Sequence, residues 1–338
     1  MTAEGRTSID AGVNLLDPRN VGQFDPSSEG VRLGFGCAGL MQLPSRRARQ
    51  RLLNEAFERG IAHFDVARMY GLGMAEAELG RFVAGRRREQ VTIATKFGID
   101  PGSPRMARLQ APARFALARV PALRTALKRR GEGPREPRRY DAGGARASLE
   151  TSLRELGTDY VDVLFVHDPG RGDQVDLEGI GELCEELVER GAVRAWGLSG
   201  DPDPCVDFAA GGFGSVLQVR DEILAPIADS PALPPRFGFG VLAEALPRIQ
   251  GHLAEPERRR RWSAATGRDC GSAEVLASLL LADALERNRG GGVLVATTRP
   301  ERLAAPAALA GRVAAGNEEP GLSAFRECVR ADFGIPGS

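Results

Sequence analysis

Short apolar runs alternate with amphipathic stretches along most of this chain, and this alternation restricts the folds that the chain can adopt. Helical spacing of apolar residues is clearest over Arg46–Arg59, Ala147–Leu156, Gly179–Arg190 and Ser272–Arg287. Eight further runs predict strands: Val31–Gly36, His63–Ala67, Val91–Phe97, Val161–His167, Val193–Ser199, Ser215–Val219, Phe237–Leu242 and Val293–Thr298. Eight strands joined by helical crossovers pair in parallel, and their closure gives an α/β fold of the (β/α)8 TIM barrel type.

The length of the chain fits one barrel with additions. A barrel of this type has roughly 250 residues, and this chain has 338. We therefore expect residues 31–338 to form a single domain, with two separate domains as the alternative. Residues 1–30 show no periodicity and are predicted to be an N-terminal extension. Apolar residues at helical spacing after Pro320 predict one C-terminal helix.

A long basic insertion, residues 101–140, interrupts the pattern after the third strand. It contains eleven arginines or lysines against two glutamates, together with several prolines. Long connections in compact domains more often carry function than not. We interpret this insertion as a lid over the active face of the barrel. An anion-binding surface and a contact with a partner protein are the alternatives.

The charge balance and the cysteines exclude several classes of function. Forty-five basic residues offset 45 acidic ones, so the net charge gives no general attraction to nucleic acid or to an anionic membrane, and a small molecule is the expected partner. The basic run Arg258–Arg261 is accordingly expected on a solvated helix face. Five scattered cysteines without ligand spacing indicate neither a disulfide framework nor a metal site, which favours a reducing cytoplasm. The sequence predicts no membrane span or signal peptide, and it does not predict the oligomeric state.

Polar groups stand where three of the predicted strands end. Asp65 and Tyr70 close the second strand, Lys96 ends the third, and His167, one of three histidines, ends the fourth. The carboxyl ends of barrel strands converge on one face, so we expect these four side chains to meet. A nearby ammonium would lower the pKa of a phenol, and a carboxylate would keep that ammonium charged. The set suits hydride transfer between a nicotinamide and a carbonyl or alcohol, with Tyr70 moving the proton and His167 orienting the substrate.

The segment Gly34–Gly39 matches the GxGxxG pattern of dinucleotide-binding loops. In such loops the glycines lead directly into a helix whose N-terminus holds the pyrophosphate. Here Leu40–Pro44 intervenes, and the helix is predicted to start after Pro44. We therefore interpret the segment as a glycine-rich first loop of the barrel.

Three longer segments carry a resemblance to the aldo-keto reductase superfamily that extends from about Val31 to Ala310. These segments are Phe64–Glu76, Ala94–Gly98 and Ser148–His167, in the order usual for that family. The phrase Tyr70–Gly73, the block Ala94–Gly98 and the long insertion are most similar to the branch that contains aldose and pyridoxal dehydrogenases. The resemblance implies an NAD(P)-dependent oxidoreductase on a TIM barrel, acting on a small carbonyl or alcohol, with catalytic residues Asp65, Tyr70, Lys96 and His167.

The same resemblance implies where a cofactor binds. Its positions in this chain are Ser199, Gln218, Thr297, Thr298 and Arg299. Arg299 favours NADP(H) over NAD(H), because a guanidinium can pair with the 2′-phosphate. The chain departs from the family pattern at Gly200, Asp221 and Pro306, where the family carries asparagine, an aromatic residue and asparagine. These departures leave two other functions open: a barrel that binds a ligand or partner without turnover, and acid-base chemistry without nucleotide, such as dehydration or epimerisation.

Overall fold

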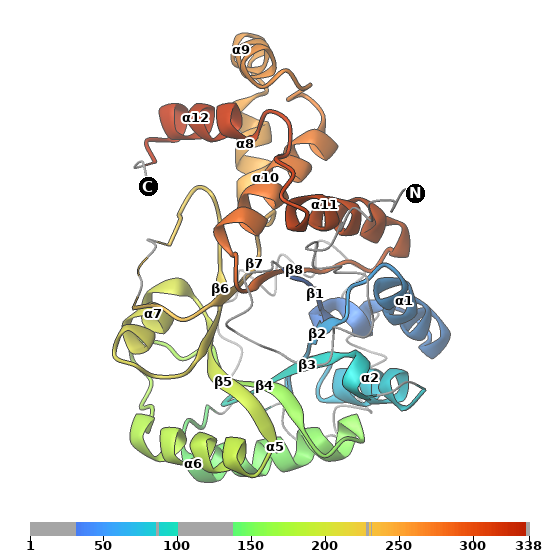
Figure 1. The fold of residues 1–338 in the computed structure, drawn as a ribbon, viewed down its shortest axis with the longest axis vertical. Helices are drawn as coiled ribbons and strands as arrows, with labels where there is room; N and C mark the ends of the chain where they lie inside the picture. The colour runs from blue at the N-terminus through green and yellow to red at the C-terminus, as the bar shows by residue number, and fades with distance from the viewer. Residues whose placement is uncertain (1–31, 86–87, 101–137, 228–229, 231, 336–338) are drawn as a thin grey trace, which may run out of the picture.

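Eight parallel strands close into a barrel in sequence order, with β1 paired to β8, in the computed structural model of this protein (Figure 1). The structure describes residues 32–85, 88–100, 138–227, 230 and 232–335. The strands are β1 (Arg32–Gly36), β2 (His63–Asp65), β3 (Thr92–Phe97), β4 (Val161–His167), β5 (Val193–Gly200), β6 (Val216–Arg220), β7 (Arg236–Phe239) and β8 (Gly292–Val295). All eight predicted strands, and the TIM barrel, are confirmed. The last strand ends three residues earlier than predicted, so Thr297 and Thr298 lie in the loop that follows it.

Helices surround the barrel in the order that the crossovers require (Figure 1). Around the ring lie α1 (Arg46–Glu58), α2 (Met74–Ala84), α5 (Ala142–Leu156), α6 (Leu177–Glu189), α7 (Pro202–Ala210), α10 (Ala273–Arg287) and α11 (Ala304–Ala314). Beyond the ring, at the top of Figure 1, lie α8 (Ala245–His252), α9 (Pro256–Thr266) and α12 (Leu322–Phe333). The four predicted helices and the C-terminal helix are confirmed. Arg258–Arg261 lies on α9 with exposed side chains, as predicted.

The strands are buried on both faces. Their inner side chains form an apolar layer that fills the barrel, and their outer side chains pack against the helices. A strand buried on both faces shows a nearly continuous apolar run, which is why the strands could be located from the sequence. The inner layer consists of Ala94, Val163, Phe165, Ala195, Val216, Phe237 and Leu294. The barrel is therefore a packed core, and the buried polar side chains of Asp65, Lys96, Ser199 and Gln218 lie toward the carboxyl ends of its strands.

The glycine-rich segment after β1 does not open into a long helix. A short 3-10 helix, η1 (Cys37–Gln42), follows the strand directly. The α-helix begins only after Ser45, whose hydroxyl accepts a hydrogen bond from the Ala48 amide at 3.2 Å. The interpretation as a first barrel loop rather than a dinucleotide fingerprint is confirmed, because the α-helix begins only at Arg46 and its N-terminus does not stand next to the glycines.

Two predicted segments lie partly or wholly outside the described residues. The N-terminal extension, residues 1–30, lies wholly outside them, and the insertion lies outside them except for its last three residues, Arg138–Tyr140. The described flanks meet at the base of the insertion: Ile99 and Arg138 form an antiparallel bridge, and the Arg139 amide donates to the Gly98 carbonyl at 2.7 Å. Within the described part of the chain, no helix has the length and apolar character needed to cross a membrane.

Candidate active site

Asp65, Lys96 and Tyr70 form a hydrogen-bonded chain at the carboxyl end of the barrel. Asp65 ends β2, and Lys96 lies on the neighbouring strand β3. Lys96 is 2% exposed, and its Nζ donates to the Asp65 carboxylate, to the Val66 carbonyl at 3.2 Å and to the Tyr70 hydroxyl at 3.3 Å. An ammonium has three protons to donate, and these three acceptors use all of them.

The loop that carries Tyr70 has an unusual backbone. After Tyr70 the chain passes through three residues with left-handed conformation, Gly71 (φ 58°), Leu72 (φ 58°) and Gly73 (φ 83°). A left-handed leucine costs on the order of 1 kcal/mol and persists only where surrounding contacts hold it. A side chain at position 71 would overlap Met41 of η1, so the loop packs tightly against the first barrel loop.

A buried carboxylate, that of Glu76, connects this loop to β3 through two hydrogen bonds. Glu76, at the start of α2, is fully buried. One of its oxygens accepts from Arg68 at 2.9 Å and the other from the Thr95 hydroxyl at 2.7 Å. The contacts therefore tie the Tyr70 loop to β3, the strand that carries Lys96. No role was predicted for Glu76, although it ends the segment Phe64–Glu76, and its position on a mostly apolar helix was the available signal.

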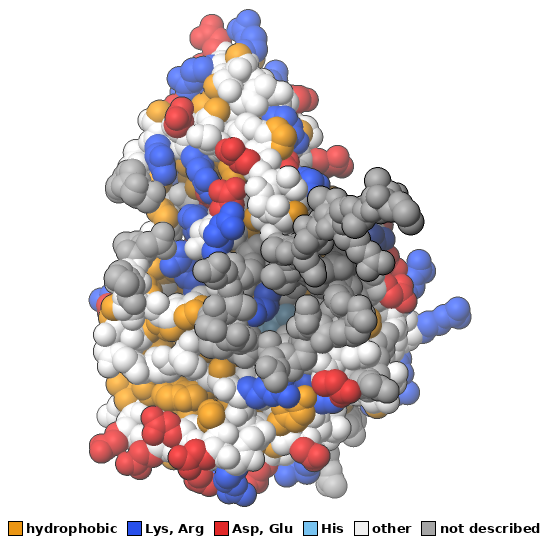
Figure 2. Space-filling model, viewed as in Figure 1, with side chains coloured by type: hydrophobic (Ala, Val, Ile, Leu, Met, Phe, Trp, Pro, Cys, Tyr) orange, Lys and Arg blue, Asp and Glu red, His pale blue; other side chains and the backbone are white. Residues whose placement is uncertain are grey.

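His167 completes the set from the end of β4. Its ring meets the Tyr70 ring edge-on, with centroids 6.0 Å apart. Tyr140, the last residue of the insertion, donates its hydroxyl to the His167 carbonyl at 2.7 Å. A pale-blue histidine side chain is visible beside blue cationic side chains near the centre of the face in Figure 2. The four residues predicted to meet thus lie together at the barrel mouth.

The titration behaviour of the set differs from expectation at Tyr70. Burial raises the pKa of Tyr70, and although the Lys96 charge opposes this effect, the net direction is upward. Lys96 acts in the predicted direction, but the loss of water around the phenolate outweighs the effect of one ammonium, so the pKa of Tyr70 is not lowered below its ordinary value. Burial disfavours the charged form of Lys96, but Asp65 and Tyr70 keep the pKa of Lys96 above its ordinary value. Burial, together with Lys96 and Arg138, lowers the pKa of His167 to about 3, so its imidazole is neutral at physiological pH.

Ser199 and Gln218 lie on the neighbouring strands in the same row as His167. The strand register pairs His167 with Ser199 and Ser199 with Gln218. Gln218 is 2% exposed, and its Oε1 atom has no hydrogen-bond partner among the described residues. A buried amide oxygen without a partner is costly. This oxygen is therefore a place where a bound molecule could supply a donor.

The three departures from the family pattern have local structural causes. A Cβ at position 200 would lie 2.9 Å from the Asp168 Cα, so the backbone of the β4 loop excludes a larger residue there. Asp221 is fully buried, and its carboxylate accepts from Arg287 and from Asn288, the latter at 2.6 Å. Asp221 thus forms an ion pair with the last residue of α10 and a hydrogen bond with its C-cap residue. Pro306 lies in the first turn of α11, where an amide proton is not needed.

The segment after β8 leads into the 3-10 helix η3 (Pro300–Leu303). The Thr297 hydroxyl accepts from the Arg299 amide at 3.0 Å, which fixes the turn. Arg299 is exposed, and its guanidinium forms no ion pair with any described residue. Thr298 is partly exposed beside it. Among the described residues, no group of three or more His, Cys, Asp or Glu side chains is arranged to hold a metal.

A model of the aldo/keto reductase family matches residues 32–204, slightly more than half of the 338 residues. This chain belongs to the aldo/keto reductase family. The resemblance found in the sequence is confirmed. The matched range includes Asp65, Tyr70, Lys96 and His167, as well as Ser199, and it ends before Gln218.

Curated relatives match about half of this chain. A D-threo-aldose 1-dehydrogenase from Pseudomonas sp. is 30% identical over 172 residues, which cover 49% of each chain. A 6-dehydroglucose reductase from Agrobacterium fabrum is 34% identical over 155 residues, which cover 44% of this chain and 42% of that protein. The chain thus matches less than half of the length of these relatives.

Solved aldo/keto reductase structures share the fold over most of the chain. The holo form of an aldo-keto reductase from Bacillus halodurans has a TM-score of 0.62 and 19% identity, covering 89% of this chain and 91% of that one. An aldo-keto reductase from Klebsiella pneumoniae, solved in complex with NADPH, has a TM-score of 0.56 and 21% identity, covering 82% and 84% of the two chains. At this identity the likeness establishes the barrel fold.

Proposed function

We propose that this protein is an NAD(P)-dependent oxidoreductase that transfers hydride between a nicotinamide and a carbonyl or alcohol, with Tyr70 as general acid and base. The observation that carries the proposal is the buried chain from Asp65 through Lys96 to the Tyr70 hydroxyl, next to a neutral His167. Such a chain serves proton transfer at a carbonyl oxygen better than it serves stability, because burying an ion pair gains little net free energy.

Each residue of the chain has a distinct part in this proposal. In the reduction direction Tyr70 donates its phenolic proton to the oxygen of the substrate as that oxygen becomes an alkoxide. Lys96 stabilises the phenolate that remains, and Asp65 keeps Lys96 charged. The neutral His167 donates a hydrogen bond to the same substrate oxygen. In the oxidation direction the proton moves back to Tyr70.

The residues on the β5, β6 and β8 side fit a nicotinamide cofactor. The partnerless Gln218 oxygen suits the amide protons of a nicotinamide carboxamide, and Ser199 lies beside it in the register. Thr297 and Thr298 offer hydroxyls for a phosphate, and Arg299 offers a guanidinium that forms no ion pair with the described residues. When bound, the nicotinamide supplies or accepts the hydride. We propose NADP(H) as the preferred form, since Arg299 suits the 2′-phosphate; the Klebsiella pneumoniae neighbour was solved with NADPH.

We propose a sugar or a similar small polar carbonyl or alcohol as the substrate. Support comes from the relatives that act on a D-threo-aldose and on 6-dehydroglucose. The five free cysteines support a reducing compartment such as the cytoplasm.

The proposal is tested by nucleotide titration followed by turnover with a panel of aldoses and small aldehydes. We expect NADPH to bind and its nicotinamide absorbance to change only when substrate is added. Tight binding without turnover across the panel would instead support a ligand-binding barrel. Turnover without nucleotide would support dehydration or epimerisation.

Tyr70→Phe tests the proton donor. The variant should lose about 10²–10⁴-fold in kcat and keep its affinity for NADPH, because only the transferable proton is removed. Tyr160→Phe is the matched control: the Tyr160 ring lies under Arg88 and Arg194, and its hydroxyl makes no hydrogen bond among the described residues. A Tyr70→Phe variant that keeps more than about a tenth of wild-type kcat would contradict the role.

A further inference from the structure

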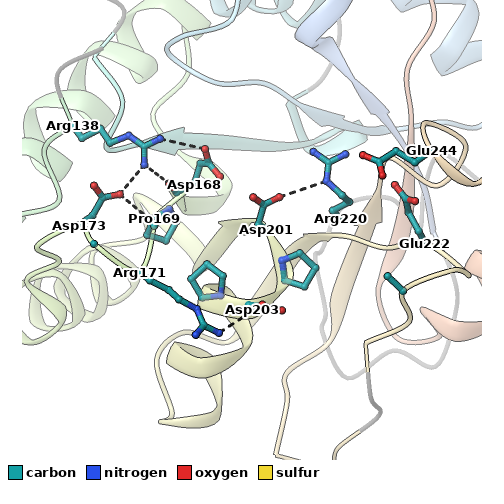
Figure 3. A pocket seen from close by; sticks show the side chains of 15 residues that line it. Arg138, Asp168, Pro169, Arg171, Asp173, Asp201, Asp203, Arg220, Glu222 and Glu244 are labelled. Atoms are coloured by element: carbon teal, nitrogen blue, oxygen red, sulfur yellow. Dashed lines mark hydrogen bonds and ion pairs between the residues drawn. The ribbon is translucent and has the colours of Figure 1, made fainter. Parts of the chain in front are cut away.

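A cavity of about 770 Å³ opens where the chain leaves β4, β5 and β6 at their carboxyl ends, and its lining side chains are drawn in Figure 3. The cavity lies next to the candidate active site, because three of its lining residues directly follow or end the strands that carry that site. Asp168 follows His167 at the end of β4, and Asp201 follows Gly200 at the end of β5. Arg220 ends β6, the strand that carries Gln218. A cavity of this volume accommodates a small polar ligand.

The side chains that line the cavity carry a net negative charge, because they include more carboxylates than guanidiniums. The lining contains six carboxylates and three guanidiniums. Each arginine is paired with an aspartate: Arg138 with Asp173 at 2.7 Å, Arg171 with Asp203 at 3.6 Å, and Arg220 with Asp201 at 3.5 Å (Figure 3). Glu222 and Glu244 have no cation within ion-pair distance among the described residues. The unpaired charge of the cavity is therefore negative and is concentrated at these two glutamates.

Glu222 is the better defined of the two. Its side chain comes from the loop after β6 and is 6% exposed, and its Oε1 atom is buried without a hydrogen-bond partner among the described residues. Burial raises the pKa of Glu222, and the nearby Glu244 raises it further, while Arg220 and Arg248 act in the opposite direction. In Figure 3 both carboxylates stand on the same wall of the cavity. A buried carboxylate that faces another carboxylate lacks its counter-charge.

We propose that Glu222 and Glu244 form a subsite for an ammonium or guanidinium group of a polar ligand. An anion is disfavoured because each arginine of the cavity is already paired with an aspartate. Calcium is disfavoured because it takes roughly six to eight oxygen ligands, and among the described residues no group of three or more His, Cys, Asp or Glu side chains is arranged to hold a metal. An organic cation would compensate both carboxylates and donate to the free Glu222 oxygen.

The cation has two possible sources, and the first rests on the proposed function. It is either an amino group of the substrate itself, in which case the enzyme prefers amino-bearing carbonyls or alcohols, or a separate small amine that binds beside the substrate. Both require the same two glutamates. The cavity continues the strands that carry His167, Ser199 and Gln218, so a substrate at the catalytic residues has its far end near it.

Calorimetric titration of the full chain without nucleotide separates these cases. The probes are D-glucosamine and D-glucose, which differ by one amino group, and 1,4-diaminobutane, at low salt and about pH 6.5, where the amines are protonated. We expect wild type to bind glucosamine about tenfold more tightly than glucose, as expected for one gained charge pair. Binding of diaminobutane as well would identify a separate amine as the ligand, whereas glucosamine preference alone would identify the substrate.

The variants Glu222→Gln and Glu244→Gln remove each charge with little change of shape. We expect the ratio of the glucose Kd to the glucosamine Kd to approach one in Glu222→Gln and to fall in Glu244→Gln. Glu182→Gln is the matched control, since Glu182 is exposed on α6 and is not part of the cavity wall. Unchanged melting temperatures establish that the variants fold.

Amine affinities that are the same in wild type and in Glu222→Gln, or no measurable binding of either amine, would overturn the inference. Neither result bears on the proposed hydride transfer, because these titrations contain no nucleotide and measure no turnover. Failure of the NADPH titration would, conversely, leave the amine binding data intact.

Discussion

Lys96 and Asp65 are the residues on which the candidate site most depends. Both are buried, and each is the counter-charge of the other. Water is too scarce there to solvate either charge alone. Removal of one partner from a buried pair leaves an uncompensated charge, whereas removal of both leaves none.

Lys96→Met should therefore destabilise the fold by about 3–5 kcal/mol, and the double variant Asp65→Asn/Lys96→Met should cost less. Catalysis should fall in both. Since Lys96 holds down the pKa of Tyr70 against burial, its loss should raise that pKa, and the rise of kcat with pH in the oxidation direction should move to higher pH. Urea unfolding and pH–rate profiles measure the two effects. A double variant less stable than Lys96→Met would show that the pair is not coupled in this way.

Arg299→Ala tests the 2′-phosphate contact. The exposed guanidinium has no ion pair to lose among the described residues, so stability should not change. NADPH affinity should fall by about tenfold or more, as expected for a charge-assisted contact, and NADH affinity should barely change. Arg289→Ala removes the same charge before β8, at the opposite end of the barrel, and serves as control. Equal losses for the two nucleotides in Arg299→Ala would rule the contact out.

At the scale of elements, the flanks of the insertion hold the end of β4. Gly98 follows β3 with φ 110°, and Tyr140 packs on its open face. From there the Tyr140 hydroxyl reaches the His167 and Asp168 carbonyls at 2.7 and 3.1 Å. The position of His167 thus depends on a contact between Gly98, which follows β3, and Tyr140, two residues before α5.

Gly98→Ala should consequently cost more stability than an ordinary left-handed glycine. Its methyl group would overlap the Tyr140 ring in addition to straining the backbone. Gly157→Ala is the matched control, because Gly157 also has positive φ (65°) but nothing within 4 Å of a new Cβ. We expect about 1 kcal/mol for Gly157→Ala and clearly more for Gly98→Ala, measured by urea unfolding. Equal costs would mean that Tyr140 moves aside freely.

At the scale of the whole molecule, the barrel buries two neutral histidines. His63 stacks on Phe237 of the inner layer with ring centroids 4.4 Å apart, and burial lowers the pKa of His63 to about 3, as it does for His167. In the unfolded chain a histidine titrates near ~6.5. Between these values the unfolded state binds protons that the folded state excludes.

The free energy of unfolding should therefore fall as the pH falls from about 6.5 towards about 3, by roughly 1.4 kcal/mol per pH unit for each histidine. Urea unfolding between about pH 6.5 and pH 5 measures this slope above the range in which most carboxylates titrate. His63→Leu should reduce the slope by about half, whatever its effect on absolute stability. A variant with the wild-type slope would show that His63 is not kept neutral by the fold.

Several predictions stay predictions at this scale. The single domain over residues 31–338, the N-terminal extension and the lid role of the basic insertion are not tested by the described residues, and neither is the absence of a nucleic-acid partner. The barrel itself is established, because all eight strands close into one sheet.

The sequence by itself determined the eight strands, the start of α1 at Ser45 and the meeting of Asp65, Tyr70, Lys96 and His167. These follow from local periodicity and from the rule that barrel strands end on one face, so no knowledge of distant contacts is required. Only the tertiary structure decided the net direction of the Tyr70 pKa, the pairing of Asp221 with Arg287 and the partnerless oxygen of Glu222. Each depends on how completely folding removes water from the group and on which charged residue, distant in sequence, then lies next to it. Residue spacing along the chain does not encode either quantity.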